Sequence, residues 1–334
     1  MLAESAPLLC APGIWQIPLP LPGRMLSSVN VYIVEDHDGM TLVDCGLSNA
    51  ESWEILQQQL DVLGIPLRHI RRVLLTHTHP DHAGLAGRLA AETGAAIWVH
   101  KLDADFYRRR NIEAETFKRR VYDWLQAHGT PTEEARTLAD GSAPMVKGAS
   151  DHPTMESYRS GDHVQIGGYD FNVVWTPGHT PGHVCFMDEL RQTVICGDHI
   201  LPHVSPNVGM HVDTEINPLN GYLASLQEFS ESTFSAALPG HGLPFSDIQS
   251  RARELREYQL GRQRLVREML EVETLTMYEL GQRVWTETKS NPWSQLWGHL
   301  RRNAIGTLVA HAELLREQGV LERTEDRPYR YGRG

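Results

Sequence analysis

Apolar residues along the first hundred positions form short runs and longer periodic stretches, which predicts a mixture of strands and helices. Short apolar or alternating runs predict strands at 15–18, 29–34, 40–43 and 73–75. From about 50 to 63 the apolar residues recur at helical spacing, between two of these strands. Strands that alternate with helices favour a layered α/β core.

The pattern changes between about residues 101 and 157, where charged and aromatic helical stretches end in a loop rich in Gly, Ser and Pro. This segment predicts a helical insertion, which we expect to form a lid or a dimer surface. Strand-like runs resume at 164–166, 171–175, 183–187 and 193–196.

After Pro244 the chain becomes helical and charged. Three helices are expected, at about 246–271, 277–284 and 293–318. A short tail with two strand-like runs follows, and three helices followed by a hairpin is the order of a winged helix. We therefore predict a main domain over 1–245, with its insertion at about 101–157, and a winged-helix-like domain over 246–334.

Composition places the chain among soluble globular proteins, with 41% hydrophobic and 22% charged residues. The net charge of -11 does not favour a protein whose main role is to coat nucleic acid or an anionic membrane. No apolar run approaches the roughly 18 residues of a membrane span, so we expect a cytoplasmic protein without a membrane partner. The four cysteines form no CxxC pair and are expected to be buried thiols, namely Cys10, Cys45, Cys185 and Cys196.

The strongest chemical signal is the sequence THTHPDHAG at 76–84, directly after an apolar strand. His77 and His79 are two apart, so in extended backbone their rings face the same side and can bind one ion. Asp81 and His82 follow on the next turn, where they can face a second site. We expect this pattern by chance in fewer than about 1% of chains of this length.

Three further strand-like runs end in residues that bind metals. His179 follows one run in a Gly/Pro turn, Asp198 ends the next, and His241 follows a fourth apolar segment. Imidazole and carboxylate ligands without thiolate favour Zn²⁺, with Fe²⁺ or Mn²⁺ as alternatives.

On these motifs the chain resembles the metallo-β-lactamase superfamily, over about residues 14–245. The resemblance implies an αββα sandwich with two divalent ions at one edge. It assigns His77, His79 and His179 to the first ion, Asp81, His82 and His241 to the second, and Asp198 to a bridge between them. It also implies that Asp44 is a buried structural carboxylate near the site. A single histidine is more often an ordinary hydrogen-bonded residue, by about nine to one, but seven ligands in the family's order reverse those odds.

No ligand position remains for four other histidines, namely His183, His199, His203 and His211. His199 and His203 follow Asp198 in a segment that should border the cleft, so one of them is a candidate to bind substrate or protonate a leaving group. Asp81 is a candidate to orient the nucleophile. The candidate catalytic residues are therefore Asp81 and His199.

The resemblance implies hydrolysis by a hydroxide held between two ions. A thioester, ester or lactone of a small molecule is favoured over an amide, because its leaving group needs less proton assistance and no certain general acid is evident. Three subfamilies fit less well. True metallo-β-lactamases lack a carboxylate at Asp198, flavodiiron proteins carry Glu in place of His79, and acyl-homoserine lactonases carry a Tyr three residues after the bridging Asp.

The whole chain looks most like glyoxalase-II-like hydrolases with a C-terminal winged helix, a group that includes an endoribonuclease with a similar GDxIL segment, here at 197–201. Cleavage of single-stranded RNA is thus a second hypothesis, supported by the basic pairs at 119–120 and 301–302 and opposed by the acidic net charge. We weigh it at about one in five. A non-catalytic ligand sensor is the third hypothesis, and a homodimer is an expected assembly.

Overall fold

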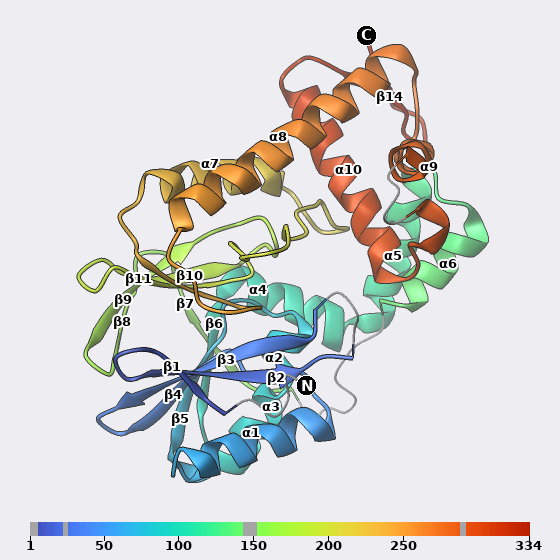
Figure 1. Cartoon of the computed structure of the whole chain (residues 1–334). Helices are drawn as coiled ribbons and strands as arrows, with labels where there is room; N and C mark the ends of the chain where they lie inside the picture. Colours follow the sequence, from blue (N-terminus) through green and yellow to red (C-terminus); the bar gives the residue numbers. More distant parts are fainter. Residues whose placement is uncertain (1–5, 23–25, 143–151, 288–291) are drawn as a thin grey trace. The chain divides into compact units, whose positions relative to one another are not determined.

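The computed structural model describes residues 6–22, 26–142, 152–287 and 292–334 (Figure 1). The chain divides into two compact units. The first comprises Met1–Tyr107, Met145–Pro206 and Phe229–Ala252, and the second comprises Arg108–Pro144, Asn207–Glu228 and Arg253–Gly334. The mixed α/β fold expected from the sequence is confirmed, because the first unit contains two sheets and the second contains mainly helices.

A seven-stranded sheet forms one layer of the first unit, with its strands in chain order from β1 to β7. Its strands are β1 (Leu8–Ala11), β2 (Ile14–Pro20), β3 (Ser28–Asp36), β4 (Gly39–Val43), β5 (Ile70–Leu74), β6 (Ala96–His100) and β7 (Met155–Tyr158). Neighbours from β1 to β4 are antiparallel, and neighbours from β4 to β7 are parallel. The carboxyl ends of β4 and β5 therefore lie at the same edge.

A five-stranded sheet forms the other layer, in the order β12-β11-β10-β9-β8. Its strands are β8 (His163–Ile166), β9 (Tyr169–Trp175), β10 (Val184–Asp188), β11 (Thr193–Gly197) and β12 (Ala236–Pro239). Only β11 and β12 pair in parallel, so both of these strands deliver their last residues to one edge.

The two sheets share a buried core, since alternate residues of their strands pack in one apolar cluster. Val43 and Leu74 of the first sheet lie in this cluster with Phe171, Val184 and Ile195 of the second. On its other face the first sheet packs against α1 (Ala50–Val62) and α3 (Ala86–Thr93). The core fixes the strand ends from which the candidate ligands project.

Helix α1 shows how local sequence sets an element boundary. Asn49 is its N-cap, and its side chain accepts a hydrogen bond of 2.7 Å from the backbone N–H of Ser52. Trp53, Leu56 and Leu60 on one face are buried. The helix expected at about 50–63 is thus confirmed.

The segment expected to be a helical insertion contains α4 (Lys101–Tyr107), a π-helical turn (Arg108–Ile112), α5 (Ala114–Ala127) and α6 (Thr132–Asp140). Its end differs from the prediction, because residues 155–157 belong to β7. The short sequence MESY carries little strand signal by itself, and it becomes a strand by pairing with the buried β6, where Met155 lies opposite Ile97.

Other helices and short elements complete the chain. They are η1 (Leu67–His69), α2 (Pro80–Ala83), α7 (Pro218–Glu231), α8 (Ile248–Val272), α9 (Met277–Glu287), η4 (Trp293–Gln295) and α10 (His299–Glu317), followed by β13 (Glu322–Arg323) and β14 (Tyr331–Gly332). The three helices expected after Pro244 are confirmed as elements. The domain boundary at 245/246 and the winged-helix identity stay predictions.

The basic pair at 301–302 makes contacts inside the second unit. Arg301 pairs with Glu134, and Arg302 donates to the carbonyl of Leu138 over 3.2 Å and to Ser142. Both guanidinium groups are thereby held against α6.

Three of the four cysteines are buried, as expected, whereas Cys10 is partly exposed, and all four are free thiols. Within the described ranges, no helix has both the length and the apolar composition needed to cross a bilayer.

A buried histidine of the second unit makes its stability depend on pH. The side chain of His128 shares a 2.8 Å hydrogen bond with the carbonyl of Trp124, and burial lowers the pKa of His128 from 6.5 to about 4. Between these values the unfolded chain binds a proton that the folded chain excludes, so acidification removes up to about 3 kcal/mol of folding free energy.

We expect His128→Gln to make the loss of stability between pH 6.5 and about 4 shallower. Urea unfolding of metal-free protein measures this, and parallel profiles for the two proteins would contradict it.

Candidate metal centre

The HxHxDH segment follows β5 and ends within the short helix α2. Residues 75–79 continue past the strand, and Pro80 occupies the first turn of α2, where its missing N–H is tolerated. His77 is fully buried, and its Nε2 lies 3.1 Å from Nδ1 of His79. The two rings meet edge to face with centroids 4.8 Å apart. The expected convergence of His77 and His79 is therefore present.

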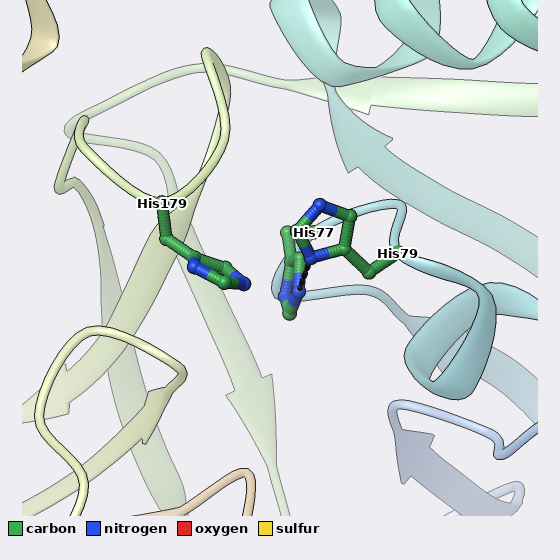
Figure 2. A group of neighbouring side chains, drawn as sticks. All are labelled: His77, His79 and His179. Atoms are coloured by element: carbon green, nitrogen blue, oxygen red, sulfur yellow. Dashed lines mark hydrogen bonds between the residues drawn. The ribbon is translucent and has the colours of Figure 1, made fainter. Parts of the chain in front are cut away.

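His179 completes a first group of three imidazoles (Figure 2). It lies in the turn between β9 and β10, and its ring centroid is 4.5 Å from that of His79 and 4.9 Å from that of His77. One donor atom from each residue falls within 4.8 Å of the others. Figure 2 shows the three rings close together, with His77 and His79 on one loop and His179 on another.

Asp81, His82 and His241 form a second group of donors. Oδ2 of Asp81 lies 3.7 Å from Nε2 of His82 and 3.4 Å from Nε2 of His241. His241 follows β12, so residues more than 150 positions apart meet at one edge of the sandwich.

Asp198 lies between the two groups. Its Oδ2 is 3.3 Å from Nε2 of His179 and 3.4 Å from Nε2 of His241, while its Oδ1 is 3.5 Å from Nε2 of His82. One carboxylate thus faces donors of both groups, which is the position that the sequence predicts for a bridging ligand.

The donor spacing fits cation binding better than direct hydrogen bonding. Two donors that each lie about 2.1 Å from one ion at tetrahedral angles are about 3.4 Å apart. Among the described residues, Nε2 of His82, Nε2 of His241 and Oδ1 of Asp198 are buried and make no hydrogen bond of ordinary geometry. Buried polar atoms of this kind normally have partners, so the residues present fit a divalent ion.

Hydrogen bonds behind the imidazoles set which ring nitrogen faces the centre. Nδ1 of His82 lies 2.7 Å from Oδ2 of Asp44, and Nδ1 of His241 lies 2.7 Å from the carbonyl of Ser28. Both partners accept hydrogen bonds, so Nδ1 carries a proton, and Nε2 is the nitrogen that faces the centre and would bind an ion once deprotonated. The expected buried carboxylate, Asp44, is in place and 2% exposed.

Asp44 also anchors the start of the HxHxDH segment. Its Oδ1 accepts the backbone N–H of Thr76 and its Oδ2 accepts the hydroxyl of Thr76, both over 2.8 Å. Asp44 itself has a left-handed backbone with φ of 60°, an uncommon conformation that aspartate tolerates better than most residues.

The glycine before His241 is required by close packing. A Cβ added to Gly240 would lie 2.3 Å from Oδ1 of Asp198 and 2.8 Å from a ring carbon of His82. The PGHG sequence therefore allows β12 to approach the other candidate ligands.

Asp198 and the residues of the second group shift one another's pKa values. Burial would raise the pKa of Asp198, but His241 and His82 hold it well below its usual range. Burial would lower the pKa of His241, but Asp198 and Asp81 raise it to about 10. The carboxylates thus make this edge of the sandwich a region that attracts cations.

The predicted catalytic residues differ in exposure. The side chain of Asp81 is 22% exposed, whereas His199 is fully buried, with burial lowering its pKa to about 3. The ring of His199 packs against Phe229 and His183. Contact between His199 and substrate stays a prediction.

Two buried residues near the centre were not predicted as functional. Nε2 of His183 accepts the backbone N–H of Asp198 over 3.1 Å. Asp103 accepts hydrogen bonds from two of the loops that carry histidines. The sequence around Asp103 contains no motif that distinguishes it from an ordinary helical aspartate.

Comparisons with known proteins agree with this geometry. The family model described as the metallo-beta-lactamase superfamily matches residues 24–241. A probable metallo-hydrolase of Bacillus subtilis is 27% identical over 277 residues, which covers 81% of this chain and 83% of the relative. An atrochrysone carboxyl ACP thioesterase of Aspergillus fumigatus is 26% identical over 237 residues, covering 70% of this chain and 57% of the thioesterase.

Two crystal structures match nearly the whole chain. A metallo-beta-lactamase family protein of Thermus thermophilus has a TM-score of 0.80 at 30% identity, covering 98% of this chain and 100% of that one. A beta-lactamase domain protein of Burkholderia ambifaria has a TM-score of 0.78 at 28% identity, covering 98% and 93% of the two chains.

The ligand assignment predicts that His77→Ala and Asp198→Ala lose metal. We expect the metal retained after dialysis to fall more than about tenfold, because the loss of an outer hydrogen-bond partner alone weakens binding by that much. Mass spectrometry of metals in folded protein measures this. His163→Ala serves as a control, since the His163 side chain is 58% exposed and pairs with the exposed carboxylate of Asp170. Retention of metal by both ligand variants would refute the assignment.

Proposed function

The chain belongs to the metallo-beta-lactamase superfamily, and from this premise we propose that it is a dinuclear metal-dependent hydrolase of small-molecule thioesters or esters. His77, His79 and His179 would hold the first ion, and Asp81, His82 and His241 the second. Zn²⁺ is the metal that this donor set favours most.

The position of Asp198 carries the proposal of two ions. Its Oδ2 lies within 3.4 Å of one imidazole from each group. A bridging carboxylate can serve both groups at once, whereas a single ion could be held by only one of them. The groups His77/His79/His179 and Asp81/His82/His241 share no residue, and a third group, His77/His82/Asp198, connects them through Asp198.

Each part of the centre has a distinct task. Bound divalent ions would make a coordinated water more acidic and polarise the carbonyl under attack. The partly exposed carboxylate of Asp81 can accept a hydrogen bond from that water and orient it. Asp44 and Ser28 hold the imidazoles of His82 and His241 so that no reorganisation is needed during the reaction.

Two observations support a thioester as substrate. One relative of this chain is named an ACP thioesterase, and a thiolate leaves without a strong proton donor. His199, the histidine expected to act as an acid, is fully buried with a lowered pKa. A substrate whose leaving group needs little protonation fits this site best.

The proposal also covers the C-terminal helices, the cellular compartment and the assembly of the chain. We infer a glyoxalase-II-like arrangement in which α8, α9, α10 and the β13–β14 pair form a winged helix, within a cytoplasmic protein that forms homodimers. RNA cleavage is not proposed as a second function, because Arg301 and Arg302 are held by contacts inside the second unit. The ligand sensor and RNA cleavage remain outcomes that the experiment can show.

A substrate panel tests the proposed function. We expect near two metals per chain, with turnover of acyl thioesters ahead of oxygen esters and lactones, and without cleavage of phosphodiesters or single-stranded RNA. Asp81→Asn should lower kcat about a hundredfold or more while leaving the first group of ligands intact. RNA cleavage that depends on His77 would replace this proposal, and metal binding without turnover of any substrate would favour a sensor.

A further inference from the structure

Asp103 is a fully buried carboxylate that accepts four hydrogen bonds. It lies in the first turn of α4 and has no exposed surface. Its Oδ2 accepts the backbone N–H of Thr78 over 2.7 Å, the hydroxyl of Thr78 over 3.2 Å and the hydroxyl of Thr180 over 3.0 Å. Its Oδ1 accepts the backbone N–H of Gly182 over 2.6 Å.

These four donors come from two different loops of the candidate centre. Thr78 stands between His77 and His79, in the loop that follows the first sheet. Thr180 and Gly182 follow His179, in the turn between two strands of the second sheet. A single carboxylate therefore links the loop that carries His77 and His79 to the turn that carries His179.

Close packing shows that this junction is built into the chain. A Cβ added to Gly182 would lie 2.5 Å from the backbone nitrogen of Asp103 and 3.0 Å from its Cβ. The glycine in the second loop thus lets the start of α4 approach it directly. A second link between the sheets, the 2.9 Å backbone hydrogen bond from Val184 to Thr76, lies beside the group but contacts neither Thr78 nor Thr180.

The number of donors explains why the residue is an aspartate. A carboxylate offers about four acceptor positions, whereas the amide of asparagine offers two and adds two donors. Burial raises the pKa of Asp103 to about 6 even though all four hydrogen bonds oppose that rise. Burial makes an ionised group unfavourable at this place, and the four hydrogen bonds offset part of that cost.

We propose that Asp103 is a positioning residue of the metal centre, which fixes the His77/His79 loop relative to the His179 loop and thereby sets the affinity of the first metal site. It touches neither the ion nor the substrate. The inference rests on the proposed metal-dependent function and adds to it a residue outside the ligand set.

Asp103→Asn tests the proposal, with Asp188→Asn as a matched control. Asp188, the last residue of β10, is 1% exposed and accepts the backbone N–H groups of Asp170 and Arg191 over 3.0 and 2.8 Å. Both variants remove a buried carboxylate that binds backbone N–H groups. We expect both to lower the stability of the metal-free chain, and only Asp103→Asn to weaken metal binding, by about 10- to 100-fold.

The readout is the Kd for Zn²⁺ in competition with a chelator, together with the visible spectrum of the Co²⁺-loaded protein, which reports ligand geometry. Equal Kd values and spectra for the wild type and Asp103→Asn, or equal weakening in both variants, would overturn the inference. If the wild-type chain binds no metal, the proposed function fails, which is a separate result.

A milder pair of variants decides the question if Asp103→Asn does not fold. Thr180→Val removes one of the four hydrogen bonds while keeping the side-chain shape, and Thr180→Ser restores the hydroxyl. We expect a weaker Zn²⁺ affinity in Thr180→Val and its recovery in Thr180→Ser. No difference between these two variants in Kd and in the Co²⁺ spectrum would contradict the role of Asp103.

Discussion

The centre depends on holding imidazole and carboxylate donor atoms 3.3 to 3.7 Å apart. Among the described residues, Nε2 of His82, Nε2 of His241 and Oδ1 of Asp198 are buried there without a hydrogen bond of ordinary geometry. Such a cluster is unfavourable for a chain by itself, since buried polar atoms that lack partners destabilise the fold. It persists because the donors project from strand ends that the core between the two sheets already fixes. The free energy of packing in that core offsets the cost of burying these polar atoms.

Two buried carboxylates hold the loops that follow the strands, and they thereby fix the positions of the imidazole rings. Asp44 acts within the first sheet, where it binds both the backbone of Thr76 and the ring of His82. Asp103 acts between the loops of the two sheets through Thr78 and Gly182. Neither residue belongs to the candidate donor groups, yet each accepts several short hydrogen bonds, and hydrogen bonds to a charged acceptor are the stronger class.

The sequence predicts the parts of this site that depend on local spacing. The pair His77/His79 follows from alternation along an extended backbone, and the order of later motifs was enough to add Asp198 and His241. Asp103 could not be predicted, because its partners are 25 and 79 positions away and its neighbours carry no pattern. For the same reason β7 was missed, since four residues with weak strand propensity depend on pairing with β6.

All seven candidate ligands belong to the first compact unit, and the family match ends at the last of them. The described residues of the second unit, in 108–142, 207–228, 253–287 and 292–334, contribute nothing to the candidate donor groups. The candidate donor set can therefore stay the same in relatives while the second unit changes. This separation is a physical reason why one superfamily can include relatives named as a probable metallo-hydrolase in Bacillus and as an ACP thioesterase in Aspergillus.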